Sequence, residues 1–276
     1  MKVYIDTKVD FAIMRIAKAL KQYAPPSIKF VNTEAEADLV IIFAHGQRRS
    51  VWWHTARLTA AGKEYVIVQL ALRSTTNPNT GDWLKIWTGA ELIWSYYDLP
   101  KLMKEDGIDL WQQYIVKCYQ SPLGVDTNLF KEIPTERIYT IFKGFHRNET
   151  IHQIDEACRI AKKTCVATEG VSDEELAITY NQCKYVSGLR KIEGFEMPVI
   201  EGLLCGARPI CYDRPHYRKW FGDLVEYIPE SGKAEIIYAI TELLMKEPRP
   251  VTEAEKRLVR EKFNWSTIIK EFWKRL

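Results

Sequence analysis

Short apolar runs alternate with amphipathic helical patterns along nearly the whole chain, which limits the fold to few classes. The alternation is typical of parallel α/β sheets, because each buried parallel strand needs a helical crossover to reach the next. Strands are predicted at residues 3–5, 29–31, 39–44, 65–72, 92–95, 115–118, 138–142, 164–167, 185–187, 208–211 and 225–228. Helices are predicted at residues 11–23, 51–61, 99–105, 150–162, 173–183, 198–205, 234–245, 253–262 and 267–276. Both halves of the chain are therefore predicted to form Rossmann-like sheets.

Length and charge narrow the classes of protein further. The chain has 276 residues, of which 46% are hydrophobic, so it can bury one large core or two smaller ones. Its formal charge of +3 is too small to indicate nucleic-acid binding by itself. No apolar run reaches the roughly 18 residues that span a bilayer, and the N-terminal residues lack the apolar stretch of a signal peptide. These observations predict a cytoplasmic protein.

The cysteines and histidines argue against a disulfide framework and against a metal site. The sequence has no Cys-x-x-Cys pair, and its histidines lack metal-binding spacing. The six cysteines lie mostly in apolar surroundings and are Cys118, Cys158, Cys165, Cys183, Cys205 and Cys211. We therefore expect reduced, buried thiols, no metal and no tightly bound cofactor.

A glycine bend and a helix start lie between two glutamates, Glu193 and Glu201. Pro198 suits the first helical turn, where its missing N–H is not needed. The N–H groups at such a helix start can bind a diphosphate. Glu201 can accept two hydroxyl donors, as the ribose of a sugar nucleotide offers, and Glu193 can do the same for a sugar ring. A purely structural explanation stays open, because the helix dipole favours a glutamate in the first turn whatever its function.

Residues 193–210, Glu-Gly-Phe-Glu-Met-Pro-x-x-Glu-Gly-x-x-Cys-Gly-x-x-Pro-Ile, resemble the donor-site signature of family-4 glycosyltransferases of the GT-B fold. Three other segments are similar to landmarks of that family, in the same order along the chain. They are Gly-Val-Asp-Thr-Asn-Leu-Phe at 124–130, Val-Ser-Asp-Glu-Glu-Leu at 171–176 and Phe-Asn-Trp-Ser at 263–266. Together the four segments cover roughly the second half of the chain.

The resemblance implies an α/β protein of the GT-B fold, with two Rossmann-like domains facing a cleft. The expected boundaries are residues 1–122 for an acceptor-side domain, 123–262 for a nucleotide-sugar-binding domain, and 263–276 for a C-terminal helix that crosses back to the first domain. The resemblance also implies a retaining, metal-independent hexosyltransferase whose donor is a UDP-sugar or a GDP-sugar.

The donor roles that the resemblance implies fall on the glycine loop and on the helix after it. Glu193 is expected to act as a catalytic residue on sugar hydroxyls, and Glu201 to hold the ribose. The other donor-binding positions expected there are Gly194, Phe195, Glu196 and Met197. Glu196 replaces the glycine that is usual in the family, so its side chain is expected to narrow the approach to the sugar.

Cations for the donor diphosphate are expected at Lys143, Arg147 and Arg190. Positive groups there would offset the charge that develops on the leaving phosphate. The Gly-Arg…Lys-Gly spacing usual in the family is not intact, and a solvated basic loop is the alternative.

The first domain contains the expected acceptor side. His45 follows the apolar run 39–44, at the sheet edge where α/β proteins bind ligands, and the family often has a histidine in this domain that touches the donor sugar. A structural histidine is the alternative. Arg48, Arg49 and Arg73, interleaved with tryptophans, predict an acceptor-binding patch. The alternative there is tryptophans in the core and arginines in solvent.

The acceptor is left open among a glycan, a lipid-linked sugar, a protein and a modified DNA base, and peripheral contact with a membrane is compatible with the sequence. The short chain is similar to small virus- or phage-encoded glycosyltransferases, which would place it in the host cytoplasm. Two other functions remain open: a sugar-nucleotide epimerase or phosphorylase on the same fold, and a non-catalytic GT-B module that binds nucleic acid.

Overall fold

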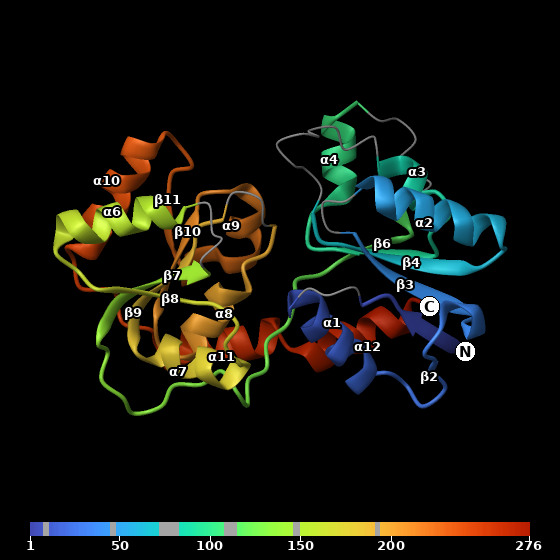
Figure 1. Cartoon of the computed structure of the whole chain (residues 1–276), viewed down its shortest axis with the longest axis horizontal. Helices are drawn as coiled ribbons and strands as arrows, with labels where there is room; N and C mark the ends of the chain where they lie inside the picture. Colours follow the sequence, from blue (N-terminus) through green and yellow to red (C-terminus); the bar gives the residue numbers. More distant parts are fainter. Residues whose placement is uncertain (8–10, 45–47, 72–82, 108–114, 146–149, 191–193) are drawn as a thin grey trace. The chain divides into compact units, whose positions relative to one another are not determined.

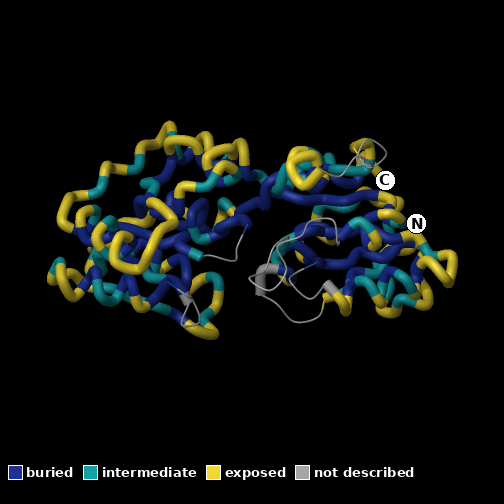
Figure 2. Tube along the Cα trace, turned by 90° about the horizontal axis from the view of Figure 1, so that it is seen from above, coloured by how far each residue is buried: buried dark blue, intermediate teal, exposed yellow. Residues whose placement is uncertain are grey.

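The computed structural model describes residues 1–7, 11–44, 48–71, 83–107, 115–145, 150–190 and 194–276. The chain divides into two compact units. The first unit contains Met1–Leu123 together with Trp265–Leu276, and the second contains Gly124–Asn264. In each unit the strands are buried and the outward sides of the helices are exposed (Figure 2).

The first unit contains a six-stranded parallel sheet with the strand order β2-β1-β3-β4-β5-β6. Its strands are β1 (Lys2–Ile5), β2 (Lys29–Phe30), β3 (Leu39–Ala44), β4 (Glu64–Gln69), β5 (Leu92–Ser95) and β6 (Cys118–Gln120). Every residue of β3 is buried, as expected for a central strand that helices cover on both faces.

Helices cover both faces of the first sheet (Figure 1). They are α1 (Phe11–Gln22), α2 (Arg48–Ala60), α3 (Leu84–Trp87), α4 (Leu99–Glu105) and α12 (Trp265–Lys274), with the short 3-10 helix η1 (Glu34–Glu36). α2, α3 and α4 lie on one face, and α1 and α12 lie side by side on the other. The indole N–H of Trp273 donates to Leu20 O (3.2 Å), and the Phe272 ring lies 5.5 Å from the Trp94 ring. The C-terminal helix is therefore part of the core of the first unit.

The second unit contains a five-stranded parallel sheet with the strand order β11-β10-β9-β7-β8. Its strands are β7 (Tyr139–Phe145), β8 (Cys165–Thr168), β9 (Cys183–Gly188), β10 (Arg208–Tyr212) and β11 (Glu226–Ile228). Its helices are α6 (Ile151–Ala161), α7 (Asp173–Asn181), α8 (Met197–Leu204), α9 (Pro215–Phe221), α10 (Lys233–Leu244) and α11 (Glu253–Lys262). The short 3-10 helix η4 (Gly222–Leu224) follows α9. α6 and α10 cover one face of this sheet, and α7, α8 and α11 lie on the other (Figure 1).

Local sequence signals explain where several of these helices begin and end. Ser172 caps α7, with Glu175 completing a capping box. α8 ends in a Schellman motif, in which Gly206 N–H donates to Leu203 O (2.9 Å) and Ala207 N–H donates to Gly202 O (2.9 Å). Gly206 has a φ of +79°, a conformation that favours glycine. The sequence after Glu201 therefore stops α8 at a defined point.

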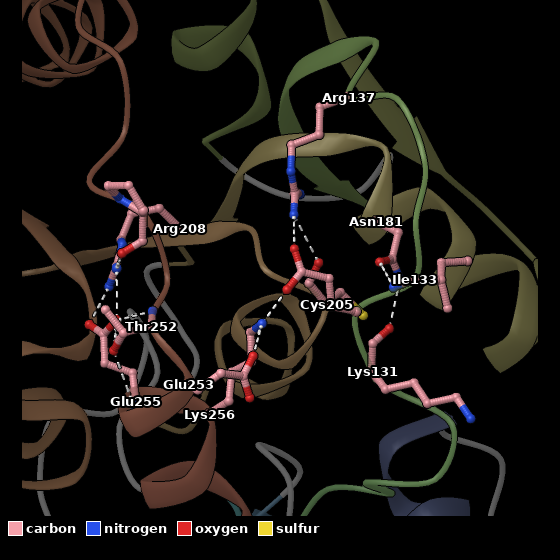
Figure 3. A network of polar contacts seen from close by, with 12 residues as sticks. Lys131, Ile133, Arg137, Asn181, Cys205, Arg208, Thr252, Glu253, Glu255 and Lys256 are labelled. Carbon is pink, nitrogen blue, oxygen red and sulfur yellow. Dashed lines mark hydrogen bonds and ion pairs between the residues drawn. The ribbon is translucent and has the colours of Figure 1, made fainter.

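Polar contacts made by two buried cations, Arg208 and Lys256, tie separate parts of the second unit together (Figure 3). Arg208, at the start of β10, is 1% exposed and forms a two-point ion pair with Glu255 of α11, with N–O distances of 2.9 and 3.1 Å. Lys256, one residue further along α11, is paired with Glu132 and with Glu253. These contacts fix α11 against the amino end of the sheet and against the segment that enters the unit.

The predicted fold class is confirmed, and several element predictions were wrong. The strand predicted at 115–118 is displaced, since β6 begins at Cys118 and Ile115 is half exposed. The helix predicted at 173–183 ends at Asn181 because Cys183 already belongs to β9. The helices α3 and α9 were not predicted, and α12 begins at Trp265, two residues before the predicted start.

All six cysteines are free thiols, and burial raises the pKa of the Cys118, Cys158 and Cys183 thiols to about 12. Of the helices within the described ranges, none is long and apolar enough to cross a membrane.

Candidate functional site

The strand order of the second sheet points to one edge as its ligand site. β8 lies on one side of β7 and β9 lies on the other, so the order reverses between β7 and β9. Open parallel sheets bind ligands at the carboxyl ends of the strands beside such a reversal. α6 follows β7 and α8 follows β9, so both helices begin at this edge. Helix N-termini present N–H groups and a positive dipole end, which suit an anion such as a diphosphate.

Glycines allow α8 to begin close to the end of β9. A Cβ atom on Gly188 would lie 2.6 Å from Val199 Cγ2 and 3.2 Å from Glu196 Cβ, so only glycine fits between the strand end and the helix start. Gly202, within α8, lets the helix pack closely against β9, because a Cβ atom on Gly202 would lie 2.7 Å from Val186 Cγ2. The N-terminus of α8 is therefore held against the carboxyl end of the sheet.

The residue at the N-cap of α8, Glu196, is 1% exposed. The hydroxyl of Tyr217, on α9, donates to Glu196 Oε1 (3.3 Å). The Glu196 side chain is thus directed into the protein and toward α9. Its backbone, rather than its carboxylate, is the part at the helix start.

Aromatic rings pack around the end of the loop that precedes α8. Phe195 is 4% exposed, and its ring lies 5.3 Å from that of Phe221 and 5.9 Å from that of Phe263. Met197 is also buried. The residues that flank the helix start are therefore core residues, and they fix the position of the loop backbone.

Glu201 is the fifth residue of α8, within its second turn, because the helix begins at Met197. The carboxylate is 1% exposed, and the hydroxyl of Tyr180, on α7, donates to Glu201 Oε2 (3.4 Å). A carboxylate so enclosed can contact a ribose only if its neighbours move aside.

Only some of the predicted phosphate ligands lie within the part of the chain that the structure describes. Lys143 lies at an irregularity of β7, beside Gly144 with a φ of +104°, and its ammonium group is paired with Asp155 of α6. Arg190 is partly buried, two residues after the end of β9. Arg147 and Glu193 lie outside the described residues, so the roles predicted for them stay predictions. Gly194, at the end of the loop, is buried.

In the first unit, most of the predicted acceptor residues lie outside the described part of the chain. This holds for His45 and Arg73, and for the side chain of Arg48 at the start of α2. Arg49 is exposed on α2, and four residues later Trp53 is 59% exposed. Trp52, beside it on α2, is partly buried, and its ring lies 4.7 Å from that of Trp53.

His54 was not among the predicted site residues. This histidine lies on α2 between two carboxylates, with Nε2 2.6 Å from Glu34 Oε2 and Nδ1 3.4 Å from Asp6 Oδ2. Hydrogen bonding to Asp6 raises the pKa of His54 against the opposing effect of burial, and Glu34 adds to the rise. Asp6 follows β1, at the carboxyl edge of the first sheet. No local pattern in the sequence could have indicated this contact.

The residues at the start of α9 were not predicted either. The guanidinium of Arg214 lies 5.5 Å from the Tyr217 ring and donates to both carboxylate oxygens of Glu230, each at 2.7 Å. Burial lowers the pKa of His216 to about 4, with Arg214 as a further cause, so the imidazole is neutral at pH 7. Pro215, at the first position of α9, was the signal that could have found this helix.

Across the described ranges, no group of three or more histidine, cysteine, aspartate or glutamate side chains is placed to hold a metal ion. The features that the structure does place at the carboxyl edge of the second sheet are two helix N-termini, a glycine loop and two enclosed glutamates. The two helix N-termini can bind an anion, and Glu201 can contact a polyhydroxylated group beside it if the groups that enclose the carboxylate move aside.

No protein-family model matches the chain, and no curated protein matches it by sequence. Solved structures do match it over its whole length. HepE from Anabaena in complex with UDP-glucose is similar with a TM-score of 0.70 and 11% identity, covering 100% of this chain and 99% of HepE. Sucrose-phosphate synthase from Thermosynechococcus elongatus is similar with a TM-score of 0.72 and 11% identity, covering 99% of this chain and 98% of that one. A Listeria monocytogenes protein assigned as a UDP-N-acetylglucosamine 2-epimerase is similar with a TM-score of 0.57 and 10% identity, covering 98% of this chain and 94% of that one. The fold is GT-B.

Proposed function

We propose that this protein transfers a sugar from a UDP-sugar to an acceptor, with retention of the anomeric configuration. The observation that carries the proposal is the edge of the second sheet where α8 begins, with Glu201 on the helix and the glycine loop before it. The similarity to HepE in complex with UDP-glucose supports a nucleotide-sugar donor at such a site.

The roles follow from the chemistry of the groups at this edge. The N-termini of α6 and α8 receive the diphosphate, assisted by Arg147 and Arg190. Once the groups that enclose it move aside, Glu201 accepts hydrogen bonds from the ribose, and Glu193 accepts them from the sugar ring. Lys143 joins the phosphate ligands only if it leaves Asp155, with which it is paired in this structure.

The transfer step needs no pair of opposed carboxyl groups. The acceptor oxygen forms a bond to the anomeric carbon on the face from which the diphosphate leaves. The bond between that carbon and the phosphate oxygen breaks, and the acceptor proton passes to the leaving diphosphate. The protein contributes positioning and stabilisation of the charge on the diphosphate.

The experiment that tests this function is incubation of the purified protein with a panel of UDP-sugars and GDP-sugars, with and without acceptors. We expect slow release of UDP from one UDP-sugar, faster release with the right acceptor, and a product with the donor's anomeric configuration by NMR. Absence of nucleotide release from every sugar nucleotide, combined with absence of UDP binding, would refute the proposal.

A sugar-nucleotide epimerase is the second function to consider, because the Listeria protein assigned to that activity shares the fold. The TM-score of the Listeria protein is lower than those of HepE and sucrose-phosphate synthase, so the epimerase function has less support. The two functions leave different products. An epimerase would change the configuration of the sugar in the recovered UDP-sugar without releasing UDP.

Sugar transfer is expected to survive an excess of EDTA. The donor loop has no Asp-x-Asp pair to hold a metal, and Arg147 and Arg190 are the cations proposed to balance the diphosphate charge. The measurement is the initial rate with EDTA, compared with the rates after adding magnesium or manganese. Complete loss of activity in EDTA, restored by either metal, would contradict this prediction.

Replacing Arg48, Arg49 and Arg73 together with glutamine is expected to raise the KM for the acceptor, or to abolish transfer, while donor hydrolysis and UDP affinity stay unchanged. The reason is that these residues belong to the first unit, whereas the donor groups belong to the second. If the acceptor carries phosphates, its affinity in the unaltered protein should fall steeply with salt. Equal loss of donor and acceptor binding would rule out this division of roles.

A further inference from the structure

Two helices from opposite ends of the chain form one exposed face of the first unit. α1 and α12 pack side by side on the same side of the sheet (Figure 1). Their inward side chains, among them Ile16, Leu20, Ile269 and Phe272, are buried in the core. Their outward side chains form one row on each helix, and several of these side chains are exposed.

The outward rows are strongly basic. On α1, Lys18 and Lys21 are exposed at positions four and seven residues after the exposed Met14. On α12, Lys270 and Lys274 are exposed four residues apart. The spacing places each set on one side of its helix. We call Met14 and these four lysines the α1–α12 basic face.

Charge is concentrated on this face far beyond the average of the protein. The α1–α12 basic face has four lysines, and the sequence of the two helices contains one acidic residue, Glu271. The formal charge of the whole chain is only +3, which is less than the charge of these four lysines alone. Glu271 is paired with Arg275 (3.1 Å) and lies 4.0 Å from Lys274. Within the described residues, no carboxylate pairs with Lys18, Lys21 or Lys270.

The composition of the face favours a lipid surface over a nucleic acid. Its cations are lysines, and exposed lysines are attracted to anionic headgroups without a defined pocket. Met14 is 59% exposed within the row and can enter the interfacial region of a bilayer. The aromatic rings of α12, by contrast, are buried: Trp265, Phe272 and Trp273 are each less than 9% exposed. They offer no surface on which bases could stack.

We propose that the α1–α12 basic face docks the protein on an anionic membrane surface. The attraction comes from phosphate-bearing and carboxylate-bearing headgroups, with Met14 adding an apolar contact. The helices lie on the surface and do not enter the hydrocarbon core. The inference stands apart from the proposed reaction, because docking requires no sugar nucleotide.

The test is co-sedimentation of the full chain with vesicles of phosphatidylcholine containing about 30% phosphatidylserine, a fraction chosen to give the negative surface potential of an anionic leaflet. We expect binding to these vesicles at low salt, weaker binding as salt rises, and little binding to vesicles of phosphatidylcholine alone. Replacing Lys18, Lys21 and Lys270 with glutamine should weaken binding by on the order of a hundredfold. These three side chains are exposed, so circular dichroism should show an unchanged fold.

A matched control removes the same charge from the opposite side of the same sheet. Lys85, Lys101 and Lys104 lie exposed on α3 and α4, and their replacement with glutamine should leave vesicle binding nearly unchanged. Equal losses in the two triple variants would show attraction by net charge alone and overturn the proposal. So would absence of binding to anionic vesicles, or binding of a DNA or RNA oligonucleotide that is tighter than vesicle binding and is lost in the first variant.

Discussion

Glu201→Gln is expected to weaken UDP binding by about tenfold to a hundredfold, without unfolding the protein. The substitution keeps the shape of the side chain and replaces a carboxylate, which can accept two hydroxyl donors, with an amide that has one accepting oxygen. A hydrogen bond to a charged group contributes about 1.5–3 kcal/mol, and each 1.4 kcal/mol is about tenfold in affinity. Calorimetric titration with UDP measures the effect directly.

Tyr180→Phe is the matched control for this prediction. It removes only the hydroxyl that donates to Glu201 Oε2 in this structure. If the carboxylate serves the ribose, loss of this competing donor should leave UDP affinity unchanged or increase it. If the carboxylate serves only the fold, both substitutions should lower the melting temperature and neither should change the dissociation constant for UDP. That second outcome would remove Glu201 from the donor site.

Arg208→Met is expected to lower the free energy of unfolding of the second unit by about 3–5 kcal/mol, the usual cost of removing one partner of a buried ion pair. The guanidinium is 1% exposed and donates to Glu255 and to three backbone carbonyls. The carbonyl acceptors are Arg249 O (3.0 Å), Leu224 O (2.9 Å) and Pro250 O (2.7 Å). Methionine fills a similar volume but leaves all of these acceptors without their donor.

The same ion pair makes stability depend on pH in acid. Burial opposes ionisation of Glu255, but hydrogen bonds from Arg208 and from Thr252 outweigh it and lower the pKa of Glu255 to about 2 from its ordinary value of 4.5. A folded-state pKa below the unfolded one stabilises the fold above about pH 4.5, and this contribution is lost as the pH falls from 4.5 toward 2. In Arg208→Met, the loss of stability over this range should be smaller, because the interaction is already absent.

Hydrogen exchange followed by mass spectrometry can assign the effect to the second unit. In Arg208→Met, peptides from Gly124–Asn264 should exchange faster, while peptides from Met1–Leu123 should change little. Arg159→Met is the control, because Arg159 forms an ion pair of similar geometry with Glu156 but is 72% exposed. Exposed pairs contribute little, so this variant should unfold almost as the natural protein does. Equal stability of the two variants would contradict the role given to Arg208.

The fold class could be predicted because the signal for it is local. Buried parallel strands such as β3 are apolar along their whole length, and the crossover between two of them contains a helix, so the pattern is visible without knowledge of any distant contact. The errors fall where the local signal is ambiguous. β6 has three residues, and α9 is short and rich in aromatic and basic residues, which gives it no clear apolar stripe.

The site could be predicted only in part, for the same reason. The glycine loop, Pro198 and Glu201 are adjacent in the sequence, so their relation to a helix start was visible. The hydroxyl groups that hold the two enclosed glutamates come from Tyr180 and Tyr217, on other helices. The roles of Glu193, Arg147 and His45, which lie outside the described residues, stay predictions.

The sequence by itself determined the alternation of strands and helices, the start of α8 after the glycine loop, and its end at Gly206, because each depends on residues within a few positions of one another. Only the tertiary structure decided which distant side chains meet. Arg208 reaches Glu255 47 residues away, and Trp273 reaches Leu20 253 residues away. The strand order determines which distant residues come into contact. It depends on how buried faces pack in three dimensions rather than on the pattern within any one segment. The α1–α12 basic face exists for this reason: its two rows of lysines come together only when the last helix of the chain packs beside the first.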